Sequence, residues 1–298
     1  MLKFDEMTER RKSGWNLRPD FMCIGVQKSG TTWLYENLGS QDWFYPGLMK
    51  EVHYFDEIFL WSKQRGLNWE NVFRRVCQNV NYHLVEHERN DSASALDLEW
   101  LYDITSIAEG PIDLDWYRGL FKKCGPDQLC GDFTPEYCLL DEEAIIYIRE
   151  NCPDTKYVIV LRDPVSRAWS EIRMKFGADL SLETFEEYAN QLKFLGRSDY
   201  SGIIERWRKV VGDDSLLVLF YDDIFDNPTS MLNDVADFLK REAQPWPLAT
   251  RLVHGGRSSQ MPGFVKDKLI AISQPSIDDL SGLYPDRCDL WRLSWKNL

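Results

Sequence analysis

An apolar run that leads into a glycine-containing turn constrains the fold of this chain more than any other segment. Residues Phe21–Val26 are apolar throughout, and the turn that follows them opens a helix at Thr31. A strand that ends in a turn and a helix directs unpaired backbone N–H groups and the positive end of the helix dipole at one point. The sequence therefore predicts an anion-binding loop at the carboxyl end of a strand.

The side chains of this loop add anion donors to those of its backbone. Lys28 supplies a full positive charge, and three neighbouring residues supply hydroxyl groups. The lysine precedes the second glycine, whereas the lysine of a Walker A loop follows it. An ordinary turn with a solvated lysine is the alternative. We expect a phosphate or sulfate to be bound here by Lys28, Ser29, Gly30, Thr31, Thr32 and Trp33.

Two further apolar runs, at residues 157–161 and 216–221, have the composition of strands that are buried on both faces. Segments with a helical spacing of apolar residues alternate with these runs, and Asn227 is expected to cap the last segment. The predicted helices cover residues 68–89, 113–123, 141–151, 164–176, 182–195, 200–211 and 228–239. Residues 60–130 and those after 243 show no strand pattern, so we expect helical or irregular cover there.

Alternating strands and helices imply a parallel sheet with right-handed crossovers, on which ligands bind at the carboxyl ends of the strands. The length of 298 residues is sufficient for one large hydrophobic core. We predict a single α/β, P-loop-like domain over residues 1–298, with a central parallel sheet flanked by helices. Its core is expected over residues 20–260, covered by a polar N-terminal arm and a C-terminal tail.

The charge balance narrows the range of partners and locations. The net charge is −13 at pH 7, with a pI near 4.9. Such a surface repels nucleic acid and other polyanions, so we expect no nucleic-acid partner. No apolar run approaches the roughly 20 residues of a membrane span. Residues 1–20 are polar and lack the apolar region of a signal peptide. A cytoplasmic protein without a membrane span is expected.

The cysteines and histidines show no metal-binding pattern. Seven cysteines without a C-x-x-C pair are typical of reduced thiols. His83 and His87 lie four residues apart in a predicted helix, but no third ligand is evident, so a solvated helix face is favoured over a metal site. We predict no bound metal. A disulfide bond between Cys124 and Cys130, or between Cys138 and Cys152, is the alternative to reduced thiols.

A second group of candidate anion-binding residues follows the run at 157–161. Arg162 stands at the end of this predicted strand, where its guanidinium can bind a phosphate in a bidentate manner. Ser170 lies two turns into the following helix and can supply a hydroxyl to the same group. Pairing of Arg162 with Asp163, with Ser170 facing solvent, is the alternative.

Together the two stretches resemble the sulfotransferase family that uses 3′-phosphoadenosine 5′-phosphosulfate (PAPS). Its members carry a Lys-Ser-Gly-Thr-Thr turn after the first strand and an Arg-x-Pro-x-x-Arg-x-x-Ser stretch after a central strand, and this chain has both in that order over residues 20–260. The resemblance implies a sulfotransferase domain in which Lys28–Thr32 bind the 5′-phosphosulfate and Arg162 and Ser170 bind the 3′-phosphate. PAPS would be the co-substrate and 3′-phosphoadenosine 5′-phosphate (PAP) the product.

A late glycine-rich segment extends this resemblance. Gly255-Gly256-Arg257 is similar to the glycine–basic loop that closes over the 3′-phosphate in the family. Gly256 and Arg257 are therefore further candidate donor-binding residues. A solvated loop is the alternative.

The stretch Lys50–Asp56 is similar to the Lys-Glu-x-His-Phe-Phe-Asp sequence of heparan-type carbohydrate sulfotransferases. That resemblance implies that Glu51 is the catalytic base and that Lys50 and His53 orient it or adjust its pKa. A base must lie within hydrogen-bond reach of the acceptor and be tuned toward neutral pH. The predicted catalytic residues are thus Lys28, Glu51 and His53; a surface carboxylate beside an aromatic patch is the alternative for Glu51.

The chain departs from the heparan-type pattern at one position. That group has a Glu-Lys-Thr/Ser-Pro stretch whose lysine faces the active site, and Phe133 stands where that lysine would be. The missing charge and the acidic balance favour a small-molecule or glycan acceptor that is not strongly anionic.

The expected activity is in-line transfer of a sulfuryl group to a hydroxyl or amine. A P-loop nucleotide kinase or hydrolase is one alternative, although it requires a Ser or Thr after a Gly-Lys pair. A non-catalytic nucleotide-binding module is another, against which the presence of Glu51 argues.

Overall fold

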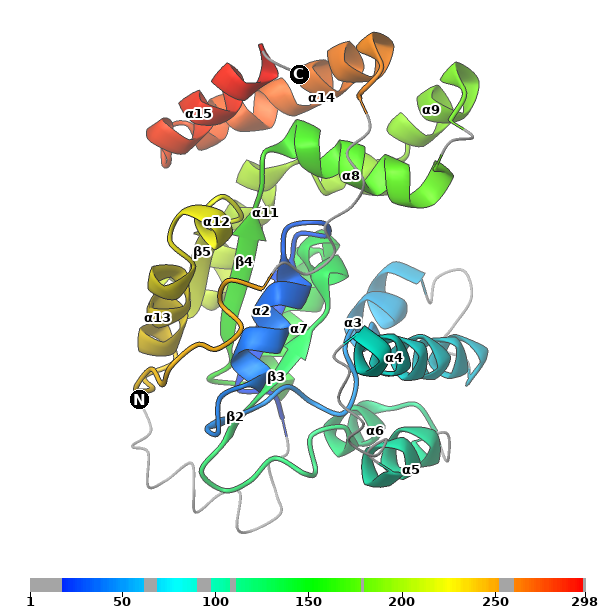
Figure 1. The fold of residues 1–298 in the computed structure, drawn as a ribbon, viewed down its shortest axis with the longest axis vertical. Coiled ribbons are helices and arrows are strands. Elements are labelled where there is room, and N and C mark those ends of the chain that lie inside the picture. The colour runs from blue at the N-terminus through cyan, green and yellow to red at the C-terminus, as the bar shows by residue number, and fades with distance from the viewer. Residues whose placement is uncertain are drawn as a thin grey trace.

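A five-stranded parallel sheet organises the chain (Figure 1). The computed structural model describes residues 18–61, 69–89, 98–107, 111–177, 180–251 and 260–296. The strand order is β2-β3-β1-β4-β5, so β1 is central and pairs with β3 and β4. The strands are β1 (Phe21–Gly25), β2 (Phe44–Tyr45), β3 (Leu129–Phe133), β4 (Lys156–Leu161) and β5 (Leu216–Phe220).

Helices flank both faces of this sheet. They are α2 (Thr31–Gly39), α3 (Tyr54–Asp56), α4 (Trp69–Arg89), α5 (Leu98–Ser106), α6 (Leu114–Gly119), α7 (Glu142–Asn151), α8 (Pro164–Phe176), α9 (Leu182–Ala189), α10 (Leu192–Gly196), α11 (Tyr200–Val211), α12 (Asp223–Asp226), α13 (Pro228–Phe238), α14 (Gly263–Leu280) and α15 (Pro285–Trp295). The predicted parallel α/β architecture is confirmed. One predicted helix, 182–195, is divided into α9 and α10, and the Asn227 side chain makes no capping hydrogen bond to α13.

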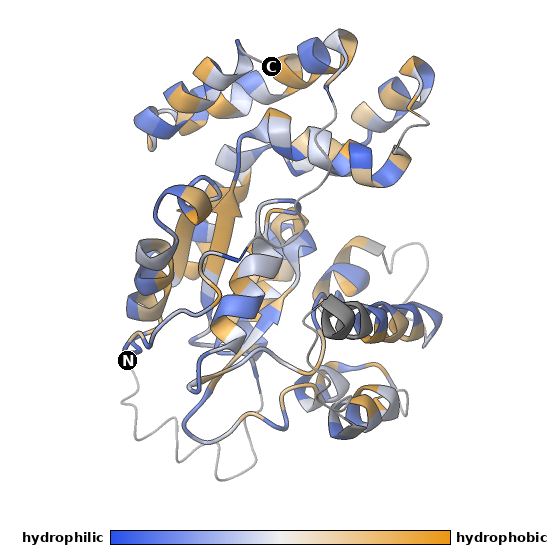
Figure 2. Ribbon diagram, viewed as in Figure 1, coloured by the Kyte–Doolittle hydropathy of each residue, from blue (hydrophilic) through white to orange (hydrophobic). Residues whose placement is uncertain are grey.

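β1 and β4 are apolar over nearly all their length because both of their faces are buried. Successive side chains of a strand point to opposite faces. Phe21 and Val158 accordingly pack in the layer that includes α2 and α13, whereas Met22 and Ile159 pack in the larger layer that includes α7, α8 and α11. β4 and β5 stand out as apolar in Figure 2.

The expectation that residues 60–130 contain no strand is wrong at its end, where β3 begins. This strand is fully buried although it contains Gly131 and Asp132. A Cβ at Gly131 would collide with the Phe44 ring, so glycine allows β2 and β3 to approach closely. Asp132 is satisfied by hydroxyl donors from Tyr117 and other residues. Phe44 and Tyr117 come from other elements, so the sequence around β3 does not reveal them.

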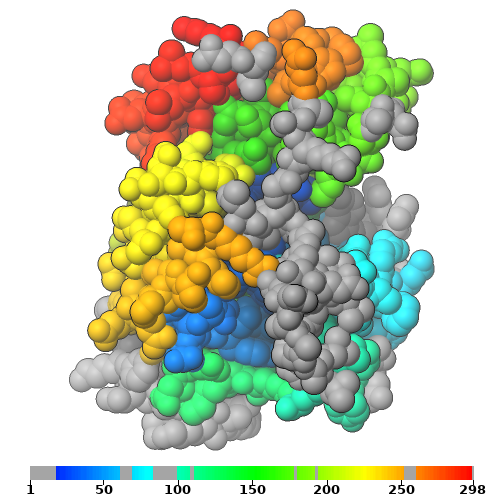
Figure 3. Space-filling view, viewed as in Figure 1, coloured from blue at the N-terminus to red at the C-terminus, as the bar shows by residue number. Residues whose placement is uncertain are grey.

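The last two helices form a layer of their own. α14 packs against α8, α11 and α15, and Figure 3 shows α14 and α15, in orange and red, against the green of α8. In the sequence between α13 and α14, residues 240–251 run along α2, where the Ala249 carbonyl accepts a hydrogen bond from the Trp33 indole at 3.1 Å.

All seven cysteines are thiols. Within the described ranges, no helix has both the length and the apolar character that crossing a bilayer requires.

Candidate active site

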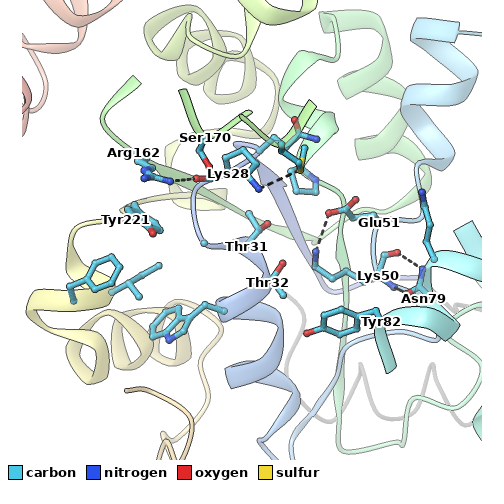
Figure 4. A pocket seen from close by; sticks show the side chains of 18 residues that line it. Lys28, Thr31, Thr32, Lys50, Glu51, Asn79, Tyr82, Arg162, Ser170 and Tyr221 are labelled. Carbon is cyan, nitrogen blue, oxygen red and sulfur yellow. Dashed lines mark hydrogen bonds and ion pairs between the residues drawn. The ribbon is translucent and has the colours of Figure 1, made fainter. Parts of the chain in front are cut away.

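A cavity of about 490 Å³ opens where β1, β4 and β5 end. Both anion-binding segments that the sequence predicts contribute to its wall, together with Glu51 (Figure 4). The carboxyl ends of neighbouring parallel strands lie at one edge of the sheet, which is why segments so distant in sequence meet there. The residues from these segments that line the cavity are Lys28, Gly30, Thr31, Thr32, Trp33, Glu51, Arg162 and Ser170.

The backbone of the loop after β1 is left-handed at two positions. Lys28 has φ 70° and Gly30 has φ 85°. Gly30 precedes the first turn of α2, and a Cβ there would collide with Ile224. Glycine is therefore required both by its conformation and by the close approach of Ile224.

Ser29 does not line the cavity, but its hydroxyl is fully buried and has no hydrogen-bond partner among the described residues. A buried polar atom without a partner costs free energy, so such an atom calls for an explanation. An oxygen of a bound anion at the start of α2 would supply the missing acceptor. The loop thus has the donors, the charge and the unsatisfied hydroxyl expected of an anion site.

Two cations face the cavity from adjacent strand ends. Arg162 donates from Nη1 to the carbonyl of Lys28 at 2.9 Å, and the Lys28 Nζ lies 3.5 Å from the Met174 sulfur, a weak acceptor. Burial, followed by the charge of Arg162, lowers the pKa of Lys28. Within the described part of the chain, no carboxylate forms an ion pair with Lys28. This end of the cavity therefore attracts anions.

The alternative in which Arg162 pairs with Asp163 is wrong. Asp163 instead caps α8, accepting from the backbone N–H of Ser166 at 2.6 Å. The Arg162 guanidinium stacks on the Tyr221 ring, 4.3 Å from its centroid, and Ser170 faces the same cavity. Both side chains therefore line the cavity that the loop after β1 also lines.

Glu51 lies at the other end of the cavity, between two cations. Its carboxylate is 3.0 Å from Lys50 Nζ and 3.8 Å from His53 Nε2, and the side chain is 43% exposed. The other ring nitrogen of His53, Nδ1, is 2.8 Å from Asp56. His53 itself does not line the cavity, so it supports Glu51 from behind.

The electrostatics of this group differ from the expectation of a base tuned toward neutral pH. Burial opposes ionisation of Glu51, but Lys50 and His53 outweigh it and hold the pKa of Glu51 well below its usual range. Burial likewise disfavours the charged form of His53, but Asp56 and Glu51 raise the pKa of His53 to about 10. At neutral pH the geometry therefore presents a carboxylate held by a cationic histidine.

The segment that carries Glu51 has an uncommon backbone conformation. Glu51 and His53 have φ values of 56° and 57°, a region that side chains other than glycine seldom adopt. Helix α4 fixes this segment by hydrogen bonds. The Asn79 side chain accepts one from the backbone N–H of Lys50 at 2.9 Å and donates one to the Lys50 carbonyl at 3.1 Å. Arg75, one turn earlier, donates to the carbonyl of Val52 at 3.1 Å.

The sequence pattern did not reveal these supporting residues, because they lie on an ordinary amphipathic helix. It also missed several residues of the cavity wall, for which nothing in the local sequence gives a signal. The missed wall residues are Gln27, Gln78, Asn79, Tyr82, Pro135, Met174, Tyr221, Ile224 and Phe225.

The side chain of Phe133 does not reach this cavity. It is fully buried between β1 and α2, with its ring 5.2 Å from that of Phe21 and 5.1 Å from that of Tyr35. The absence of a lysine at position 133 therefore does not determine the charge of the cavity wall.

Some predicted residues lie outside the described part of the chain. These are Gly255, Gly256 and Arg257, together with the side chains of His83 and His87. Among the residues described, no group of three or more His, Cys, Asp or Glu side chains is arranged to hold a metal ion.

Comparison with known proteins places this site in a family. A model of the sulfotransferase family matches residues 19–245. Heparan sulfate glucosamine 3-O-sulfotransferase 3B1 of Homo sapiens is 28% identical over 136 residues, which cover 42% of this chain and 35% of that protein. The chain therefore spans about a third of the length of the curated relatives it matches.

Solved structures with the same fold are more distant in sequence. A sulfotransferase from Alicyclobacillus acidocaldarius is 20% identical, with a TM-score of 0.63, covering 92% of this chain and 99% of that one. The sulfotransferase domain from the curacin biosynthetic pathway is 16% identical, with a TM-score of 0.53, covering 81% and 82%.

Proposed function

Because the chain belongs to the sulfotransferase family, we propose that it transfers the sulfuryl group of PAPS to a hydroxyl or amine of an acceptor. One observation carries the proposal: the loop after β1, the turn after β4 and Glu51 line the same cavity of about 490 Å³. That volume is typical of sites for small molecules and cofactors, which span about 300–1,000 Å³.

The donor would bind with its 5′ end at the loop after β1. Lys28, Thr31 and Thr32 line the cavity beside the first turn of α2, where backbone N–H groups and the helix dipole favour an anion. The unsatisfied hydroxyl of Ser29 supports the same assignment. Trp33 completes this wall.

The 3′-phosphate of the donor would bind at the turn after β4. The Arg162 guanidinium, fixed on the Tyr221 ring, provides a planar fork suited to a phosphate, and Ser170 adds a hydroxyl. Gly256 and Arg257 stay predicted ligands of this phosphate.

Transfer requires that the bond from sulfur to the leaving phosphate oxygen breaks while a bond to the acceptor forms. Lys28 and the N–H groups of α2 would stabilise the negative charge that builds on the leaving oxygen. Glu51 would receive the proton of the acceptor, and PAP would leave as the second product. His53, as a cation, would hold Glu51 in place and would not take a proton itself.

We propose a small-molecule or glycan acceptor without strong negative charge. The matched relatives are named for heparan sulfate, a polyanion, whereas this chain has a net charge of −13. The cavity is also lined by the uncharged side chains of Gln78 and Tyr82, and Lys50 is paired with Glu51. The other cations among the cavity-lining residues described, Lys28 and Arg162, belong to the proposed donor site.

Ligand-induced stabilisation and transfer of label together test this function. PAP at about 100 times its Kd should stabilise the protein by about 2.7 kcal/mol and raise Tm by roughly 5 °C, whereas ATP with Mg²⁺ should not. Radiolabelled PAPS should pass its label to a member of an acceptor panel of neutral glycans and phenols. Stabilisation by ATP with Mg²⁺ alone would indicate a kinase or hydrolase, and PAP binding without transfer to any acceptor would indicate a non-catalytic module.

The Lys28→Met variant connects the activity to the cavity. Loss of a donor that stabilises transition-state charge lowers kcat by about 10²–10³-fold. Lys209, which is exposed and paired with Glu142 on the surface, offers a matched control: Lys209→Met should keep full activity. Near-normal kcat in Lys28→Met would refute the role of this loop.

A further inference from the structure

The last helix of the chain contacts the turn that carries Arg162. At the end of α15, Trp295 donates from its indole Nε1 to Asp163 Oδ2 at 2.7 Å, and the Ser294 hydroxyl donates to the same oxygen at 3.0 Å. Both Trp295 and Asp163 are buried. Figure 1 shows α15 above the carboxyl ends of β4 and β5, the edge of the sheet at which the cavity opens.

Asp163 joins this helix to the candidate phosphate site. Its other carboxylate oxygen caps α8 through Ser166, and its neighbour in sequence is Arg162. Within the described residues the Asp163 carboxylate has no cationic partner, and burial raises its pKa. Its position therefore depends on the hydrogen bonds donated by Ser166, Ser294 and Trp295.

A second set of contacts joins α15 to the turn after β5. Trp291 donates from Nε1 to Asp222 at 3.1 Å, and Arg287 pairs with Asp223. These two carboxylates follow Tyr221, the ring on which the Arg162 guanidinium stacks. The helix thus fixes the backbone on both sides of the Arg162–Tyr221 stack, although it does not itself line the cavity.

We propose that α15 positions the 3′-phosphate site of the donor, with Trp295 as the principal positioning residue, acting on Arg162 through Asp163. This proposal rests on the proposed function and deepens it. The helix lies beyond residues 19–245, the part of the chain that the family model matches. A guanidinium binds phosphate well only when its fork is held at the correct angle, so a small displacement of this turn weakens the 3′-phosphate contact.

The test replaces Trp295 with phenylalanine, which removes the N–H donor and keeps an aromatic ring. Binding of PAP and of AMP, which lacks the 3′-phosphate, is measured by calorimetry on the full chain. Outer-shell hydrogen bonds around metal sites alter affinity by about 10–100-fold, and we expect an effect near the lower end, roughly tenfold weaker PAP binding. AMP binding should not change. The KM for PAPS should rise with kcat at saturating PAPS retained.

Trp207 offers a matched control for the general cost of a Trp→Phe change in the core. It is fully buried, and its Nε1 has no partner in the described part of the structure. Trp207→Phe should therefore leave the ratio of PAP affinity to AMP affinity unchanged. Should Trp295→Phe fail to fold, Ser294→Ala removes the second donor to the same oxygen, and we expect the same pattern with a smaller change.

The possible outcomes separate this proposal from the proposed function. Unchanged PAP binding, or equal losses of PAP and AMP binding in Trp295→Phe, would overturn the role of α15 and leave the sulfotransferase assignment in place. Failure of the wild-type protein to bind PAP would overturn both. In an Arg162→Ala background, Trp295→Phe should cause no further loss of PAP affinity, because the contact on which it acts is already gone.

Discussion

Replacing His53 with glutamine should move the acidic limb of the kcat–pH profile to higher pH. The imidazole Nε2 lies 3.8 Å from the carboxylate of Glu51, and Asp56 keeps the ring cationic by raising the pKa of His53 to about 10. Glutamine has no charge. Its introduction removes part of the field that holds the pKa of Glu51 below its usual range, so Glu51 in the variant takes up its proton at a higher pH.

The expected size of the effect follows from the distance and the exposure. Two unit charges about 4 Å apart interact by about 1 kcal/mol in water and about 4 kcal/mol at an effective dielectric constant of about 20. Glu51 is 43% exposed, which places the interaction between these limits. At about 1.4 kcal/mol for each unit of pKa, the acidic limb should move by roughly 1–2 pH units.

Lys50 provides an internal comparison, because its Nζ lies closer to the carboxylate, at 3.0 Å. Lys50→Met should therefore move the acidic limb at least as far as His53→Gln. The measurement is kcat with labelled PAPS at saturation, followed from about pH 8 down to the lowest pH at which each variant stays folded, because the pKa of Glu51 lies well below the usual range of a carboxylate.

Three results would refute this reasoning. An acidic limb near neutral pH in the wild-type protein would show that Glu51 is not held ionised or is not the base. An unchanged limb in both variants would show that the titrating group lies elsewhere. Loss of kcat at all pH values with an unmoved limb would mean that His53 acts on the geometry of Glu51 alone.

Two further predictions concern the support of Glu51. Asn79→Ala should lower kcat by about tenfold or more and leave PAP binding intact, because Asn79 anchors both backbone groups of Lys50. Arg74→Ala, at an exposed site on the same helix, is the control. A loss of PAP binding in Asn79→Ala would contradict the assignment. The raised pKa of His53 should make stability depend on pH: its contribution is complete below about pH 6.5 and is lost as pH rises toward 10. Urea unfolding at pH 7 and pH 10 should show a decline that is smaller in His53→Gln than in the wild type by an amount on the order of a few kcal/mol, and equal declines would count against the His53–Asp56 pair.

The elements that could be predicted are those whose apolar sequence matches their burial in the folded chain. β4 is apolar at every position except its first because both of its faces are buried, so the pattern 157–161 identified it. The loop after β1 and the turn at Arg162 could be placed together because strand order and parallel direction bring strand ends to one edge. β3 could not be found in this way, because the buried Asp132 in it is satisfied by the hydroxyl groups of Tyr117, Thr134 and Tyr137.

The electrostatic state of Glu51 shows why the rest of the site required coordinates. In an extended segment, Lys50 and Glu51 would point to opposite sides, and the sequence contains no indication of left-handed backbone at Glu51 and His53. It is this backbone, held by Asn79, that brings two cations to one carboxylate. The sequence therefore correctly indicated that Glu51 lies in the cavity wall. The direction in which its pKa is shifted followed only from the three-dimensional arrangement.

A low pKa at Glu51 also constrains how such a base can work. Such a carboxylate is too weak a base to remove the proton of an unreacted hydroxyl. As the acceptor oxygen bonds to sulfur, however, it becomes cationic and its proton becomes strongly acidic, so a weak base at the correct distance is sufficient. Position then contributes more than basicity. In the proposed mechanism, Glu51 therefore acts through its position, which a backbone φ of 56° and the contacts with α4 fix.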